Sequence, residues 1–153
     1  MGYGSKSLND WRDEAHRIAR EHGFKDATVA EDIALMHSEL SEALEDERDG
    51  KGPKDIWYEE KIPAFNEKGE RIVVDGKPAF VAIRHDRPFP KLANGEWDIE
   101  HPYKPCGIRS EIADVMIRAL HFAGKHGIDI EQGVREKMHY NETREHKHGD
   151  KKL

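Results

Sequence analysis

Two pairs of acidic residues are the part of this 153-residue sequence whose types and spacing point to chemistry. Glu39 and Glu42 stand three residues apart in one segment, and Glu111 and Asp114 repeat that spacing in another. Residues at this spacing project from the same side of an α-helix. Carboxylates that converge raise one another's pKa unless a cation lies between them. The pattern therefore indicates a site for a hard divalent cation, which takes oxygen ligands.

Both acidic pairs border the apolar stripe of a predicted helix. At about 100° per residue, the first pair falls just off one edge of the stripe in a helix predicted over residues 28–48. The second pair falls off the edge of the stripe in a helix predicted over residues 108–126. If the two helices pack together, four carboxylates converge at the rim of a bundle. The alternative is that both pairs lie on ordinary solvated faces of charged helices.

A third cluster, near the C-terminus, is suited to bind phosphate. Lys137, Asn141 and Arg144 recur at helical spacing and share one face of a helix predicted over residues 130–145. An arginine can hold a phosphate group through two parallel hydrogen bonds. The simpler interpretation is a basic last turn, which the helix dipole favours.

Three longer strings contain these residues. They are LMHSELSEALE at 35–45, KPCGIRSEIADV at 104–115, and KMHYNETR at 137–144 with KHG at 147–149. Together they resemble the MazG-like family of nucleoside triphosphate pyrophosphohydrolases, over residues 8–49 and 104–150. The marker of that family is E-x-x-E followed by E-x-x-D, and both halves are present here.

The resemblance implies a fold and an assembly. The expected fold class is all-α, a four- to five-helix MazG-like bundle with a small β-hairpin insertion between the two acidic helices. The expected domain organisation is a single domain over residues 1–153. The expected partners are a nucleoside triphosphate and further copies of the chain, in a homodimer or homotetramer.

The resemblance also implies a reaction. It is cleavage of a (d)NTP between its α- and β-phosphates, which gives a (d)NMP and pyrophosphate. The cofactor is Mg²⁺, with Mn²⁺ as a substitute. The catalytic residues and metal ligands implied are Glu39, Glu42, Glu111 and Asp114. The phosphate-binding residues implied are Lys137, Asn141, Arg144 and Lys147.

The segment between the acidic helices departs from the family, which joins them by a short connection. Asp75-Gly76 between two β-prone runs is the strongest short-range signal of a hairpin. We therefore predict an insertion at about 53–105, with one small hairpin and otherwise irregular chain. It could form a lid, an oligomer contact or a wall of the base pocket. Its aromatic residues are candidates for base stacking or for a small core of its own: Trp57, Tyr58, Phe80, Phe89, Trp97 and Tyr103.

Composition excludes several classes of protein. No apolar run reaches the roughly 20 residues that a membrane span requires. The net charge of −6 argues against sequence-independent binding to nucleic acid, which rests on Lys and Arg. The single cysteine, Cys106, excludes a disulfide framework. With no apolar signal-peptide core at the N-terminus, the expected location is the cytoplasm of a bacterial cell, or of the host if a virus encodes the chain.

The balance of charged and apolar residues favours an oligomer. Charged residues make up 37% of the chain, against about 25% in an average protein. Such a chain has a lean core, and we expect it to share apolar surface with further copies. Cys106 stands just before a predicted helix start, where a thiol pKa can fall. With no evident partner, it is expected to be a plain thiol.

Two other functions stay open at this stage. Phosphoribosyl-ATP pyrophosphatase belongs to the same superfamily and acts on a different substrate. A non-catalytic helical interaction module would use the acidic residues only as a solvated face. Activity with any triphosphate distinguishes the enzymes from the module, and substrate breadth distinguishes the two enzymes.

Overall fold

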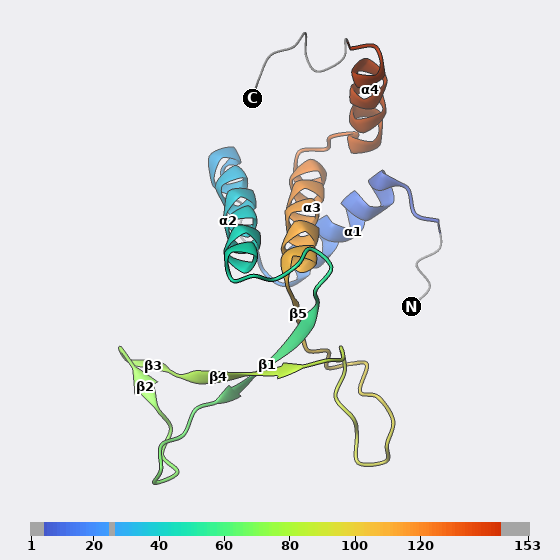
Figure 1. The fold of residues 1–153 in the computed structure, drawn as a ribbon. Helices are drawn as coiled ribbons and strands as arrows, with labels where there is room; N and C mark the ends of the chain where they lie inside the picture. Colours follow the sequence, from blue (N-terminus) through green and yellow to red (C-terminus); the bar gives the residue numbers. More distant parts are fainter. Residues whose placement is uncertain (1–4, 25–26, 145–153) are drawn as a thin grey trace. The chain divides into compact units, whose positions relative to one another are not determined.

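The computed structural model describes residues 5–24 and 27–144. In these residues the chain forms four helices and five strands, in the order drawn in Figure 1. It divides into two compact units, one made of residues 1–37 with 115–153 and the other of residues 38–114. The division falls within two helices, α2 (Val29–Arg48) and α3 (Ile108–Lys125), so each of these helices contributes to both units.

The first unit is helical, and its helices begin where the sequence predicts. α1 (Leu8–Glu21) begins at Ser7, whose hydroxyl accepts a hydrogen bond from the Asp10 amide while the Asp10 carboxylate accepts one from the Ser7 amide. Thr28 and Glu31 make the same reciprocal pair at the start of α2. Such pairs satisfy amide groups that the first turn of a helix leaves without partners. α2 therefore begins directly after residue 28, where the predicted helix starts.

α4 (Ile130–Glu142) packs against α1 within this unit. The predicted N-cap Asp129 accepts a hydrogen bond from the first turn of α4 and another, at 2.8 Å, from the side-chain amide of Asn9. Arg12 donates to the carbonyl oxygen of Ile128 at 2.8 Å. These long-range hydrogen bonds hold α1 against the start of α4.

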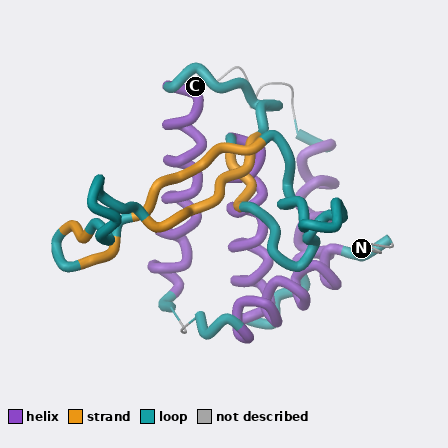
Figure 2. Tube along the Cα trace, turned by 90° about the horizontal axis from the view of Figure 1, so that it is seen from below, coloured by secondary structure: helices purple, strands orange, loops and turns teal. Residues whose placement is uncertain are grey.

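The second unit contains a three-stranded antiparallel sheet in the order β4–β1–β5. β1 (Trp57–Pro63) is the central strand, and it pairs with β4 (Phe80–His85) on one side and with β5 (Lys104–Cys106) on the other. Figure 2 shows β1 and β4 running side by side as a long ribbon. β2 (Val73–Val74) and β3 (Lys77–Pro78) form a separate two-stranded sheet.

The predicted all-α bundle is therefore wrong, because the chain has a mixed fold of helices and an antiparallel sheet. The predicted hairpin exists, with Asp75 and Gly76 at φ 48° and 75° in its turn. Its strands are only two residues long, and the chain after Pro78 leaves the hairpin to pair with β1. This pairing joins segments that are distant in sequence. No turn signal marks it, so local patterns could not predict it.

Gly107 connects β5 to α3 at a point of close approach. Its φ is +104°, and a Cβ atom there would lie 2.7 Å from the carbonyl oxygen of Asp55 and 3.0 Å from the Trp57 ring. Its own carbonyl oxygen accepts hydrogen bonds from the amides of Ser110 and Glu111, at 2.7 and 3.2 Å. The contact therefore fixes the first turn of α3 against the sheet.

Replacing Gly107 by alanine is expected to destabilise the chain through both strain and collision. Gly69→Ala is the matched control, because Gly69 has a φ of +76° with nothing within 4 Å of its Cβ position. Both variants suffer backbone strain, and only Gly107→Ala also meets Asp55. We expect Gly107→Ala to lower the free energy of unfolding by about 1–3 kcal/mol more than Gly69→Ala, measured by chemical denaturation. Equal losses in the two variants would contradict the proposed close contact.

Candidate metal centre

Three carboxylates converge in the second unit. Oxygen atoms of Glu39 on α2 and of Glu111 and Asp114 on α3 all lie within 4.8 Å of one another. Glu39 is only 7% exposed and Glu111 only 5%. Oxygen ligands grouped in this way, from two helices, suit one hard divalent cation. Three of the four carboxylates predicted to converge are therefore brought together by the fold.

Of the three carboxylates, Glu111 is the one that a bound cation would stabilise most. Within the described part of the chain its carboxylate makes no hydrogen bond and no ion pair. Burial raises the pKa of Glu111, the charge of Lys104 opposes that rise, and the carboxylates of Glu42, Asp114 and Glu39 add to it. A buried charge without a partner costs free energy. A cation bound by this group would remove that cost.

Glu42, the fourth predicted ligand, lies outside the set of three. It is exposed on α2, and it lines a pocket of about 210 Å³ together with Glu111. Its charge acts on Glu111, as the pKa of that residue shows. Glu42 is thus a neighbour of the centre, and its direct ligation of a metal stays a prediction.

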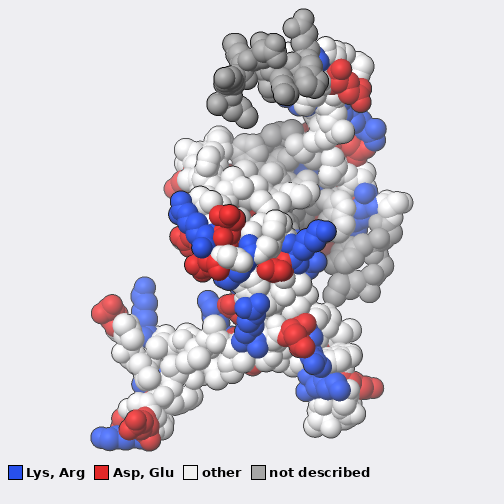
Figure 3. All heavy atoms as spheres, viewed as in Figure 1, with Lys and Arg blue, Asp and Glu red and all other residues white. Residues whose placement is uncertain are grey.

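The pocket beside the centre is formed by the end of α2, by β1 and by the turn from β5 into α3. Trp57 and Cys106, which stand opposite each other across β1 and β5, both line it. Most of its other residues are acidic: Glu42, Glu45, Asp46, Asp49, Glu59 and Glu111. Figure 3 shows acidic side chains gathered at the C-terminal end of α2, with basic ones among them. The pocket is therefore strongly polar.

In the C-terminal half of α2, the acidic residue Glu39 is buried while two leucines of the apolar stripe are exposed. Leu40 and Leu44 are 44% and 48% exposed, whereas Glu39 and Ala43 are buried. The expectation that these leucines face the core is wrong for the single chain. The reason is that the sheet and the start of α3 lie on the acidic side of this helix segment.

The predicted phosphate-binding residues belong to α4 and the residues after it. Lys137 and Asn141 are exposed on α4, and Arg144 follows the helix. Lys137 and Arg144 both lie over the ring of Tyr140, at 5.3 and 5.8 Å from its centroid. Lys147 lies outside the described residues. α4 is part of the first unit, so a role for these residues at the carboxylate centre stays a prediction.

Two aromatic residues of the insertion, Trp57 and Tyr103, contact neighbouring side chains in the second unit. Trp57 is 5% exposed, and Lys51 and Arg84 each lie 4.6 Å from its ring centroid. Trp57 therefore belongs to a small core of the second unit. Tyr103 stacks on His85 with ring centroids 4.0 Å apart.

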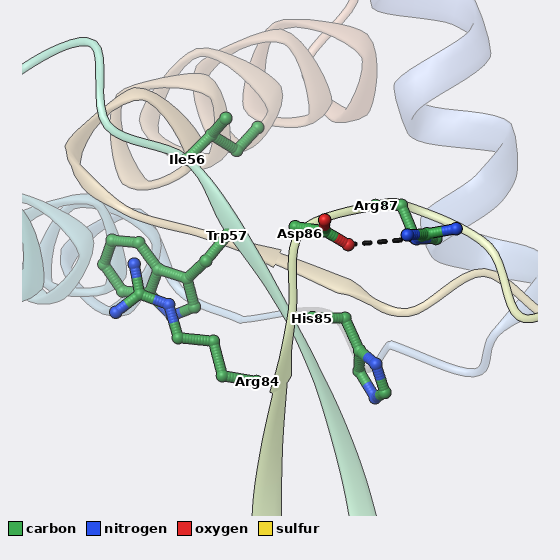
Figure 4. Close-up of a pocket in the computed structure, with 6 residues that line it drawn as sticks. All are labelled: Ile56, Trp57, Arg84, His85, Asp86 and Arg87. Carbon is green, nitrogen blue, oxygen red and sulfur yellow. Dashed lines mark hydrogen bonds and ion pairs between the residues drawn. The ribbon is translucent and has the colours of Figure 1, made fainter.

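A second hollow, of about 570 Å³, is lined by Trp57 together with Ile56, Arg84, His85, Asp86 and Arg87. Figure 4 shows Arg84 lying across Trp57, while His85 points away from it. Asp86 accepts a hydrogen bond from Arg87 at 2.9 Å, and this neutralises that part of the hollow. The two arginines that line the hollow are therefore engaged by their neighbours, Arg84 by the Trp57 ring and Arg87 by Asp86.

The sequence interpretation missed the pocket because the pocket depends on strand pairing. The segment that becomes β1 contains aromatic and β-branched residues, which is a strand signal. However, it lacks the strict alternation of apolar and polar residues that marks a half-buried strand. The face that it shares with β5 is visible only once the register is known.

Comparisons of the chain with protein-family models, with curated proteins and with solved structures gave no match. In the described residues, no helix combines the length and the apolar character needed to cross a membrane. The interpretation of the centre therefore depends on its own residues.

The thiol of Cys106 is expected to be unreactive at neutral pH. Burial raises the pKa of Cys106 to about 11, and the charges of Glu59 and Glu111 contribute to that rise. Burial therefore outweighs any lowering of this pKa by the start of α3. Because the thiolate is the nucleophile, we expect a thiol reagent to modify Cys106 at least about tenfold more slowly in the folded chain than in denaturant. The check is the rate of absorbance change with a chromogenic disulfide reagent, and equal rates would contradict the burial.

Proposed function

We propose that this chain is a Mg²⁺-dependent nucleoside triphosphate pyrophosphohydrolase, which converts a (d)NTP to a (d)NMP and pyrophosphate. The observation that carries the proposal is the buried carboxylate of Glu111, which has no partner in the described part of the chain, with Glu39 and Asp114 close to it. The resemblance to MazG-like enzymes supports it, because the residues that converge come from both halves of the E-x-x-E and E-x-x-D pattern.

The donor set fits the proposed cofactor. Mg²⁺ prefers oxygen ligands and binds through a few carboxylates together with waters and substrate phosphates. Glu39, Glu111 and Asp114 offer carboxylate oxygens alone. When bound, Mg²⁺ would supply charge stabilisation to phosphate oxygens and a lower pKa to a water molecule.

The chain's own residues would then place the reactants. Glu42 lines the pocket and lies outside the set of three, so we assign it the task of accepting a proton from the attacking water. The water oxygen bonds to a phosphorus of the α–β anhydride, and the bridging P–O bond breaks. Pyrophosphate and the monophosphate are the two products. Lys137, Asn141 and Arg144 are proposed to bind the phosphates.

The assembly is proposed to be a homodimer or a homotetramer. The exposed stripe of α2, which includes Leu40 and Leu44, supports the proposal because soluble chains seldom leave contiguous apolar surface uncovered. The proposed location is the cytoplasm. The same stripe also fits the rival hypothesis, a non-catalytic helical interaction module, and the turnover experiment below decides between the two.

Substitutions at the centre are expected to abolish turnover without unfolding the chain. Glu39→Gln and Asp114→Asn each remove one metal-binding charge at nearly constant volume, so pyrophosphate release from NTPs and dNTPs should fall by about 100-fold or more. Glu47→Gln is the control, since Glu47 is an exposed residue of the same helix, α2. The measurement is pyrophosphate release with Mg²⁺, with circular dichroism as the check on folding.

If the wild-type chain releases no pyrophosphate from any NTP or dNTP, the result would favour the non-catalytic interaction module. Turnover of phosphoribosyl-ATP alone would identify the related pyrophosphatase instead. Release of orthophosphate in place of pyrophosphate would contradict cleavage between the α- and β-phosphates.

Mg²⁺ is expected to stabilise the wild-type chain and to have little effect on Glu111→Gln. Because the pKa of Glu111 is raised in the folded chain, this carboxyl stabilises the fold at acid pH, and that contribution is lost as the pH rises through the raised pKa. At neutral pH the charged form is a cost, so Glu111→Gln should melt at the same temperature as metal-free wild type or higher. At about 100 times its Kd, Mg²⁺ should add about 2.7 kcal/mol to wild-type stability.

The measurement is thermal unfolding at neutral pH with and without Mg²⁺, with Glu47→Gln as the matched control. A Mg²⁺ shift that persists in Glu111→Gln would place the metal elsewhere in the chain.

A further inference from the structure

A lysine of β5 lies on the same face of the sheet as the pocket of the metal centre. In an antiparallel pair, residues directly opposite each other share a face, and so do residues two apart along one strand. Trp57 stands opposite Cys106, and Glu59 stands opposite Lys104. Trp57, Glu59 and Cys106 all line the pocket. Lys104 therefore lies on the pocket's face, at the edge of the sheet.

The ammonium group of Lys104 is available for a ligand. Lys104 is exposed, and in the described residues its side chain makes no hydrogen bond and no ion pair. Lys51, which lines the same pocket, is already engaged. Its Nζ lies 2.8 Å from Asp46, 3.7 Å from Asp49 and 4.6 Å from the centroid of the Trp57 ring. Of these two lysines, Lys51 is the one that forms ion pairs among the described residues.

Lys104 is close in sequence to the carboxylate centre, and the fold constrains its position. β5 runs directly into Gly107, whose close contact with Asp55 joins the sheet to the first turn of α3, where Glu111 lies. A ligand held by the centre would therefore meet Lys104 in a fixed place.

We propose that Lys104 binds a phosphate group of the substrate at the carboxylate centre, which makes the last strand of the sheet a part of the substrate site. The inference rests on the proposed function. A nucleoside triphosphate is an anion, and the pocket that it would approach is lined mostly by carboxylates. A cation at the edge of this pocket offsets the repulsion. An ammonium group offers three donors and binds phosphate oxygens as a point charge.

The test compares Lys104→Gln with Lys77→Gln in the full chain. Lys77 begins β3, is exposed and is followed by proline, just as Lys104 begins β5, is exposed and is followed by proline. The two variants change the net charge equally. The probes are Mg²⁺ alone and a non-hydrolysable α,β-methylene dNTP with Mg²⁺, both measured by titration calorimetry. KM and kcat for the best dNTP are measured in parallel.

Lys104→Gln is expected to weaken binding of the analogue and to raise KM by about tenfold or more, the loss typical of a hydrogen bond to a charged group. Mg²⁺ alone should bind Lys104→Gln as tightly as wild type or more tightly, because a repelling charge has been removed. Lys104→Arg should recover part of the affinity for the analogue. Lys77→Gln should match wild type in every measurement.

Two results would overturn the inference while leaving the proposed function intact. One is an unchanged affinity for the analogue in Lys104→Gln beside normal turnover in wild type. The other is a joint loss of Mg²⁺ and analogue binding in Lys104→Gln, which would mean that the substitution damages the centre itself. If wild type neither binds Mg²⁺ nor turns over any triphosphate, the proposed function fails and the inference fails with it.

Discussion

The second unit depends on a buried carboxylate, that of Glu111, which has no hydrogen-bond partner among the described residues. Glu111 is held at the start of α3 with two further carboxylates close by, and burial raises its pKa. A protein seldom keeps such a group unless the group binds something, because desolvation of a charge is expensive. The arrangement lowers the free energy of unfolding of the metal-free chain, and a bound cation would relieve that cost. The proposed activity depends on the binding of such a cation.

The sheet holds this carboxylate in place. β1 and β5 pair over three positions, and Gly107 then passes close to Asp55 and Trp57 as the chain enters α3. Because Glu111 lies in the first turn of α3, its position follows from strand pairing as much as from helix packing. The insertion looks like an accessory segment in the sequence, but its strands help to position the carboxylates of the centre.

The sequence predicted what local chemistry decides. The helices predicted over residues 28–48, 108–126 and 130–145 are present as α2, α3 and α4, and the turn at Asp75-Gly76 followed from the preference of these residues for positive φ. Helical spacing predicted that four carboxylates of two helices converge, and three of them do so. All of these features depend on residues within a few positions of one another, or on a motif.

The features that were missed depend on long-range pairing. The antiparallel sheet joins β1 to β4 and β5 across the insertion, and no local signal specifies a partner or a register. The burial of Glu39 on α2 was missed for the same reason. A helical wheel identifies an apolar stripe such as the one that includes Leu40 and Leu44, but it does not say what covers each face.

The placement of Pro105 in the middle of β5 has a consequence for how the sheet can grow. Proline has no amide proton, and in a sheet it is found on edge strands with that side facing solvent. Pro105 stands opposite Tyr58 of the central strand, so the outer edge of β5 lacks a donor where a further strand would need one. β4 contains no proline, and Phe80 and Val81 within it are exposed. Any strand that extends this sheet, in an assembly or in an aggregate, must therefore join at β4.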